Sequence, residues 1–113
     1  MNAKLRAARF EALKGMKCIA CQFEGCEQLT VTEIHHLNEF GHAGMKRRGD
    51  EFTVPLCSWH HRSVCPEGVK PGDALFYMGP SLAQNSKRFR ETYGTDDELL
   101  EHTNKALGLK ESA

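Results

Sequence analysis

Two pairs of residues in this sequence have the spacing of metal ligands. Cys18 and Cys21 are separated by two residues, and Cys57 and His60 have the same separation. Two intervening residues allow both side chains of a turn to reach one tetrahedral ion, at about 2.0 to 2.3 Å from each ligand atom. Four protein ligands leave no open position on the ion. The spacing therefore predicts a structural zinc ion that ties the start of the chain to residues 57–60.

Further histidines lie beside these ligand pairs. His35 and His36 follow one another after a predicted strand, and His61 directly follows His60. Adjacent residues at the end of a strand point to opposite sides. We therefore expect one residue of the first pair to bind a cation and the other to face a substrate. In the second pair, His60 faces the structural zinc and His61 points elsewhere. Two ions then use the histidines without competition.

Short predicted elements hold these residues. Apolar residues at helical spacing predict a helix over residues 3–14, and Gly15 follows where a C-terminal glycine cap is typical. Strands are predicted at 29–34, from an alternating β-branched run, and at 52–56. A short helix is expected at 58–64.

The rest of the chain is divided by glycines, prolines and capping residues. Residues 37–51 are predicted to be a loop and residues 65–80 to be irregular. Ser81 and Gln84 have the spacing of a capping box for a helix that ends near Gly94. A second capping box, Thr95 with Glu98, opens a helix that runs to about Leu107.

The length of the chain favours one small domain. It has 113 residues, of which 40% are hydrophobic, and a core this thin usually needs a metal, a disulfide or a partner. We predict an α+β fold: a single zinc-stapled domain over residues 1–113. It comprises a basic N-terminal helix (1–15), a zinc knuckle with a ββα-metal finger (16–65) and C-terminal helices (81–108).

The cysteines and the terminal sequence indicate a cytoplasmic protein. The first 17 residues lack the apolar run of a signal peptide, and no stretch approaches the roughly 20 apolar residues of a membrane span. Five cysteines, an odd number, fit a reducing compartment, where cysteine patterns more often bind metal than form disulfides. Cys26 is an alternative zinc ligand, and Cys65 is expected to be an ordinary thiol.

The charges form local clusters although the formal net charge is zero. Local basic patches can bind phosphates whatever the total charge, but each cluster is equally consistent with a solvated face. The N-terminal helix is basic, and the acidic residues gather in the last helix. The candidate DNA contacts are Lys46, Arg47, Arg48, Lys87 and Arg88.

Together these motifs resemble the HNH, or His-Me finger, endonucleases. The shared pattern is CxxC, a strand ending in His-His, a loop, and Pro-Leu-Cys-x-x-His-His-Arg. The resemblance implies that His35 and His61 bind a catalytic divalent cation and that His36 is the general base. It also implies that Cys18, Cys21, Cys57 and His60 hold the structural zinc. Arg62, one residue further, is placed to contact a phosphate.

Within that group, the chain is similar to the recombination-enhancement (Ref) nucleases of phages, which depend on RecA. The similarity covers about residues 15 to 100 and includes Ile34–Leu37, Pro55–Cys57, and Phe89 followed by Tyr93-Gly94-Thr95. It implies DNA as the substrate, a RecA filament as a partner and no role for a membrane. Mg²⁺ or Mn²⁺ is the expected catalytic cation, with Zn²⁺ or Ni²⁺ as alternatives.

Two departures from the pattern keep other functions open. The middle Asn of the HNH signature is absent, and the segment 75–79 lacks the further His that relatives often carry. One alternative is a zinc-stabilised module that binds DNA or a partner without catalysis. Another is a structural zinc domain that recognises a protein through its acidic last helix. His42 and His102 are interpreted as surface residues, and Trp59 as a residue of the core.

Overall fold

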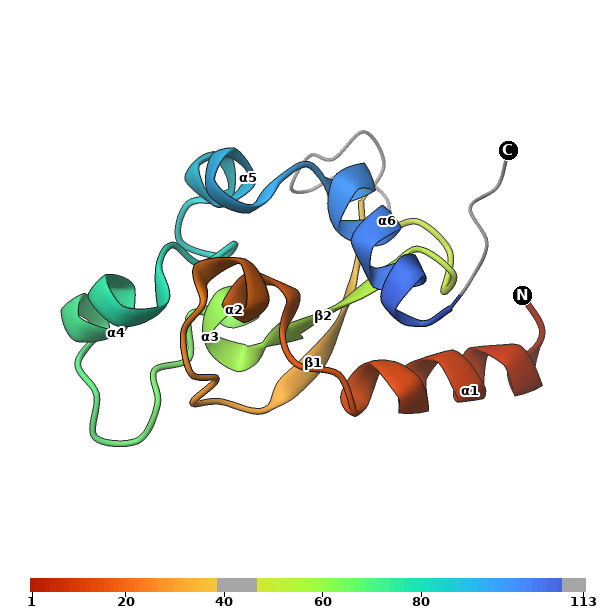
Figure 1. Ribbon diagram of the computed structural model, residues 1–113, viewed down its shortest axis with the longest axis horizontal. Coiled ribbons are helices and arrows are strands. Elements are labelled where there is room, and N and C mark those ends of the chain that lie inside the picture. Colours follow the sequence, from red (N-terminus) through yellow and green to blue (C-terminus); the bar gives the residue numbers. More distant parts are fainter. Residues whose placement is uncertain (39–46, 109–113) are drawn as a thin grey trace.

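The computed structural model describes residues 1–38 and 47–108 and has a small α+β fold (Figure 1). Its elements in chain order are α1 (Ala3–Lys14), α2 (Ile19–Glu24), β1 (Thr32–His36), β2 (Thr53–Cys57), α3 (Ser58–Arg62), α4 (Pro71–Met78), α5 (Ser86–Tyr93) and α6 (Asp96–Ala106). The two strands cross the middle of the molecule, and α1 and α4 lie at opposite ends of its long axis (Figure 1). The α+β class predicted from the sequence is confirmed. Across the described ranges, no helix is both long and apolar enough to cross a membrane.

The two strands form an antiparallel sheet whose register runs from the pair Thr32–Cys57 to the pair His36–Thr53. The predicted limits of the first strand, residues 29–34, are wrong, because β1 begins later and includes both histidines. The pairing partner sets these limits, since β2 begins at Thr53 and the residue opposite it is His36. The second strand is shifted by one residue from its predicted range, so that Cys57 is its last residue.

The first and the last helix agree with the sequence predictions. α1 spans the predicted residues and ends at the cap Gly15. The Thr95 hydroxyl accepts a hydrogen bond from the backbone N–H of Glu98, and the Glu98 carboxylate accepts one from the backbone N–H of Thr95. This is the predicted capping box, and it satisfies two donors that a helix N-terminus otherwise leaves unpaired.

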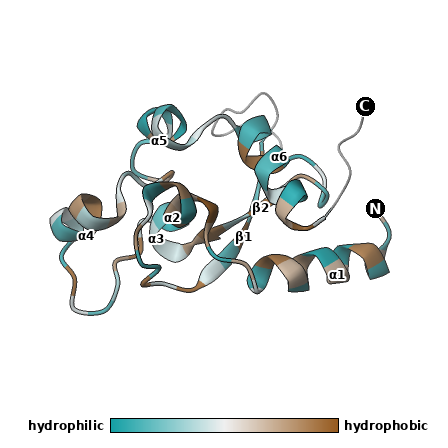
Figure 2. Cartoon of the chain, in the orientation of Figure 1, coloured by the Kyte–Doolittle hydropathy of each residue, from teal (hydrophilic) through white to brown (hydrophobic). Residues whose placement is uncertain are grey.

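The segment between α3 and α5 differs from its prediction. Residues 65–80 are not irregular throughout, because α4 occupies Pro71–Met78. Pro71 stands at the start of this helix, where the N–H that proline lacks would have no partner in the helix. The proline and glycine that suggested a loop therefore mark the ends of a helix. Part of α4 is coloured as hydrophobic in Figure 2, and the side chains of Phe76 and Tyr77 in this helix are exposed.

The helix expected from Ser81 begins later. α5 starts at Ser86, and the side chain of Asn85 caps it by accepting from the N–H of Arg88. Ser81 is buried, and its hydroxyl accepts a longer hydrogen bond, 3.4 Å, from the N–H of Gln84. The capping-box spacing at Ser81 thus corresponds to a turn before the helix rather than to the helix start.

Trp59 is fully buried in the core, as predicted. Its indole N–H donates to the carbonyl oxygen of Gly79 at 3.0 Å, which joins α3 to the end of α4. Gly79 has a φ of +81°, and a Cβ there would lie 2.2 Å from the hydroxyl of Tyr93. Only glycine fits this position without displacing a buried phenol.

Arg9 anchors α1 to the sheet. Its side chain is 7% exposed and donates to the hydroxyl of Thr53 at 2.8 Å, to the carbonyl oxygen of Thr53 at 2.7 Å and to Asn104 at 3.0 Å. Arg9 is one of the basic residues of the N-terminal helix. Because its guanidinium is buried and hydrogen-bonded, it is a structural residue and not part of an exposed basic surface.

Replacing Arg9 by alanine is expected to lower the free energy of unfolding by about 2 kcal/mol, because a charged donor to a buried carbonyl and hydroxyl is lost. The midpoint of urea unfolding, followed by circular dichroism, measures the change. Lys4→Ala on the exposed face of the same helix is the matched control, with an expected change below about 0.5 kcal/mol. Equal midpoints for the two variants would show that the Arg9 contacts do not hold the helix.

Candidate metal centre and catalytic histidines

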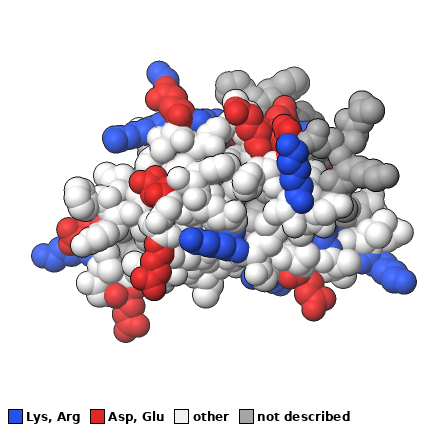
Figure 3. Space-filling view, viewed as in Figure 1, with Lys and Arg blue, Asp and Glu red and all other residues white. Residues whose placement is uncertain are grey.

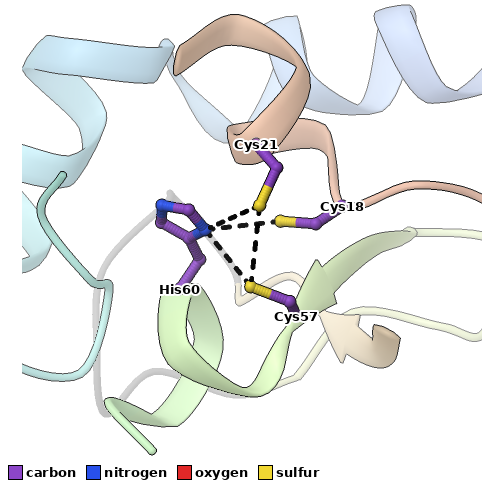
Figure 4. Close-up of side chains that lie close together, drawn as sticks. All are labelled: Cys18, Cys21, Cys57 and His60. Atoms are coloured by element: carbon purple, nitrogen blue, oxygen red, sulfur yellow. Dashed lines mark hydrogen bonds between the residues drawn. The ribbon is translucent and has the colours of Figure 1, made fainter. Parts of the chain in front are cut away.

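The four predicted zinc ligands lie together in the core (Figure 4). Cys18, Cys21, Cys57 and His60 are each 0% exposed, and their ligand atoms all lie within 4.8 Å of one another. The Nδ1 atom of His60 is 3.3 Å from the sulfur of Cys57 and 3.5 Å from the sulfurs of Cys18 and Cys21. The sulfurs of Cys21 and Cys57 are 3.8 Å apart.

These distances fit a tetrahedral ion. Ligand atoms about 2.3 Å from a central zinc lie about 3.8 Å apart if both are sulfur, and a sulfur–nitrogen pair lies about 3.5 Å apart. The three buried sulfurs and the Nδ1 atom of His60 converge on one point, where a bound ion would satisfy all four. The cluster can therefore hold a metal ion, and the donor set of three thiols and one imidazole suits zinc.

Secondary structure brings the ligands together from three elements. Cys18 precedes α2 and Cys21 lies in its first turn, Cys57 ends β2, and His60 lies in α3 (Figure 4). The sequence predicted a turn where α2 stands, because a helix of six residues is too short to give a clear period.

The end of α4 fixes the orientation of His60. The Nε2 atom donates to the carbonyl oxygen of Met78, which leaves Nδ1 with its lone pair toward the thiols. Hydrogen bonds from the thiols of Cys18 and Cys21 lower the pKa of Cys57, so the cluster stabilises a thiolate. Cys26 and Cys65 are not part of this group of ligands.

His35 and His61 face one another at a second place. The Nδ1 atom of His35 lies 3.2 Å from the Nε2 atom of His61. Two nitrogens that bind one cation at about 2.1 Å lie about 3.0 Å apart in an octahedron and about 3.4 Å apart in a tetrahedron. Burial lowers the pKa of His35 to about 3, and the positive charge of Arg90 acts in the same direction. A neutral imidazole is the form that binds a metal.

The histidine pair opens into a pocket of about 350 Å³ between β1, α3 and the start of α5. Besides the two histidines, Asn38, Gln84 and Arg90 line it. The Nε atom of Arg90 donates to Asp96 at 3.1 Å. In the sequence, Arg90 belongs to a basic cluster with Lys87 and Arg88, and its spacing does not distinguish it from a surface arginine. Over residues 1–38 and 47–108, no third Cys, His or carboxylate completes a group of ligands here.

His36 has different neighbours from His35, as the alternation of side chains along a strand requires. Its Nε2 atom lies 3.0 Å from a carboxylate oxygen of Asp50, and the ring of Phe10 packs edge-on against it. When Nε2–H donates to Asp50, the lone pair of a neutral His36 is on Nδ1.

Arg62 forms an ion pair with Glu33. Its Nε atom donates to the Oε1 atom of Glu33 at 2.9 Å, and Nη2 donates to the other carboxylate oxygen. The hydrogen bond from Arg62 holds the pKa of Glu33 below its ordinary value. The Nδ1 atom of His61 lies 3.0 Å from the same Oε1 atom. The role of Glu33 was not apparent in the sequence, where it is an ordinary polar residue of a strand.

The remaining candidate DNA contacts are dispersed. Lys87 and Arg88 are exposed on α5, and Arg47 is exposed beside the pairing of its backbone with Asn38. Arg48 forms an ion pair with Asp97 at 3.1 Å and lies 3.9 Å above the ring of Phe52. On the face of the molecule drawn in Figure 3, basic and acidic side chains are mixed and do not form one continuous basic surface. Lys46 and His42 lie outside the described residues.

The comparisons with known proteins identify the family. The model of the family described as recombination enhancement, RecA-dependent nuclease, matches residues 3–108. The chain belongs to this family. No curated protein matches it in sequence. The family description makes the chain a nuclease, and the match covers every residue of the metal cluster and of the histidine pair.

Proposed function

We propose that the protein is a metal-dependent DNA endonuclease of the HNH type, in which β1, β2 and α3 form the ββα-metal finger. The observation that carries this proposal is the facing pair of His35 and His61, with His36 next to one of them at the end of β1. Membership of a family of RecA-dependent nucleases supports DNA as the substrate and a RecA filament as the partner. A cytoplasmic site of action is part of the proposal.

In the proposed reaction, His36 takes a proton from a water molecule through Nδ1, while its Nε2–H donates a hydrogen bond to Asp50 and orients the ring. The oxygen of that water attacks phosphorus, the bond from phosphorus to the 3′ oxygen breaks, and the leaving 3′ oxygen takes a proton from solvent to give a 3′ hydroxyl. His35 and His61 would hold a divalent cation, Mg²⁺ or Mn²⁺ in the first instance, which would supply Lewis-acid stabilisation of the developing negative charge.

Cationic side chains around the pocket bind the phosphate backbone in this proposal. Arg90 lines the pocket itself, and its guanidinium retains donors beyond the one that contacts Asp96. Arg62 is 59% exposed in its side chain and contributes a donor that Glu33 does not use. The exposed residues Lys87 and Arg88 on α5 extend the contact along the DNA strand. Lys46, Arg47 and Arg48 are proposed as further contacts with the DNA backbone.

Cleavage of supercoiled plasmid and of single-stranded DNA tests the proposal directly. The purified protein is incubated with Mg²⁺, Mn²⁺ or EDTA, each with and without RecA and ATP. Cleavage that needs the divalent ion and is stimulated by RecA is the expected result. Cleavage in EDTA would contradict the cation, and cleavage that RecA does not change would contradict the partner.

A non-catalytic DNA-binding or partner-binding module is the second candidate. The observation that favours it is that the histidine pair lacks a third protein ligand within the described part of the chain. A folded, zinc-containing protein that binds DNA but leaves it intact in every lane would support this module and overturn the nuclease.

A further inference from the structure

We propose that Glu33 is a positioning residue for the catalytic cation, because its carboxylate orients His61 toward the ion that His35 shares. This inference rests on the cation site of the proposed function. It concerns three connected contacts: Arg62 to Glu33, Glu33 to His61, and His61 to His35.

The first step of the argument is the state of the His61 ring. A neutral imidazole carries one N–H and one lone pair. The Oε1 atom of Glu33 lies 3.0 Å from Nδ1 of His61, and an ionised carboxylate can only accept a hydrogen bond. The proton of His61 is therefore on Nδ1, and the lone pair is on Nε2. It is Nε2 that lies 3.2 Å from the Nδ1 atom of His35.

The second step concerns the strand that carries Glu33. Residues two apart in a strand have their side chains on the same face, so Glu33 and His35 project from β1 together. α3 packs against this face and places His61 between them. One strand thus supplies both a ligand and the carboxylate that orients the other ligand. Carboxylate–histidine–metal arrangements of this kind raise the basicity of the ligand and fix its ring.

The third step is the rigidity of the carboxylate. Both oxygens of Glu33 accept from the guanidinium of Arg62, and this two-point contact fixes the plane of the carboxylate. The Glu33 side chain is 21% exposed, whereas that of Arg62 is 59% exposed. The exposed arginine therefore braces a carboxylate that is itself largely shielded from water, and the brace keeps Oε1 in line with Nδ1 of His61.

The experiment measures Mn²⁺ binding to the full zinc-loaded chain by the electron paramagnetic resonance signal of the free ion. Glu33→Ala is expected to weaken binding by about 10- to 100-fold, the range seen when a partner that orients a metal ligand is removed. Glu33→Gln keeps an acceptor oxygen for Nδ1–H and is expected to restore most of the affinity. Arg62→Gln removes the ion pair but not the Glu33–His61 contact, and its loss is expected to be smaller than that of Glu33→Ala.

Each alternative has a distinct outcome. Wild-type affinity in Glu33→Ala overturns the positioning role. A Glu33→Gln variant as weak as Glu33→Ala shows that charge alone matters and also overturns it. If Arg62→Gln weakens Mn²⁺ binding as much as Glu33→Ala does, the effect comes from the ion pair and not from the Glu33–His61 contact, and the positioning role is overturned. Absence of Mn²⁺ binding in the wild type overturns the cation site itself, and with it the proposed function. Zinc content and circular dichroism confirm that each variant is folded.

Discussion

Replacing His36 by alanine is expected to reduce the rate of DNA cleavage by about 10² to 10⁴-fold while leaving the fold and the zinc content unchanged. The reason is the position of the ring at the end of β1, where Asp50 holds Nε2 at 3.0 Å and Nδ1 retains the lone pair. The His36 side chain is 18% exposed and is not among the buried residues of the core, so its loss leaves the packing largely intact.

Single-turnover cleavage of plasmid in the presence of Mn²⁺ and RecA measures this loss, and two companion variants give it a specific meaning. His102→Ala, on α6, where the ring contacts Gln22 and Phe23 rather than His36, is the matched control and should cleave at the wild-type rate. His35→Ala should raise the Mn²⁺ concentration needed for half-maximal cleavage, whereas His36→Ala should leave that concentration unchanged. Added imidazole should restore part of the activity of His36→Ala. Normal cleavage by His36→Ala would remove the residue from the general-base role.

The four ligands of the metal cluster could be predicted from the sequence, because each pair of ligands is recognised by its local spacing. A gap of two residues between Cys18 and Cys21, and again between Cys57 and His60, positions each pair without reference to the rest of the fold. The same holds for the capping box at Thr95, which involves residues three apart. Contacts that depend on neighbours in the chain are those a single sequence reveals best.

The errors arose where a distant partner decides the local structure. The limits of β1 follow from its pairing with β2 rather than from its own β-branched run. α4 holds His60 and Trp59 through backbone carbonyls, and no side-chain pattern in residues 65–80 signals such a function. Arg9 has the sequence context of a surface charge, yet its partners Thr53 and Asn104 are far away along the chain.

The candidate catalytic site combines both cases. The adjacent histidines and the motif around His61 could be found from the sequence, because their order and spacing match a known pattern. The contacts of Glu33 with His61 and of Asp50 with His36 could not, because each joins side chains that are far apart along the chain. The ligands of a site are thus easier to find in a sequence than the residues that hold them in place.

Removing one ligand of the metal cluster is expected to have the largest effect on stability. Cys57→Ser should lose the bound zinc and lower the midpoint of thermal unfolding by more than about 15 °C, or leave the chain unfolded, because zinc binding in such sites contributes folding free energy directly. The cluster joins α2 to the β2–α3 corner, and its ligands are part of the core rather than attached to its surface. A small core has little apolar surface to replace that connection.

Zinc content by atomic absorption and thermal unfolding by circular dichroism test this expectation, with Cys65→Ser as the matched control. Cys65 is a partly buried cysteine that packs against the same core but does not belong to the cluster, so its variant should keep both the zinc and the unfolding midpoint. A strong chelator added to the wild type should reproduce the effect of Cys57→Ser. If Cys57→Ser retains one zinc and the wild-type midpoint, the cluster is a set of buried thiols that the fold does not need. If Cys57→Ser loses zinc and stability while Cys65→Ser keeps both, metal binding is a condition of folding. The histidine pair is then assembled only in the metal-loaded chain.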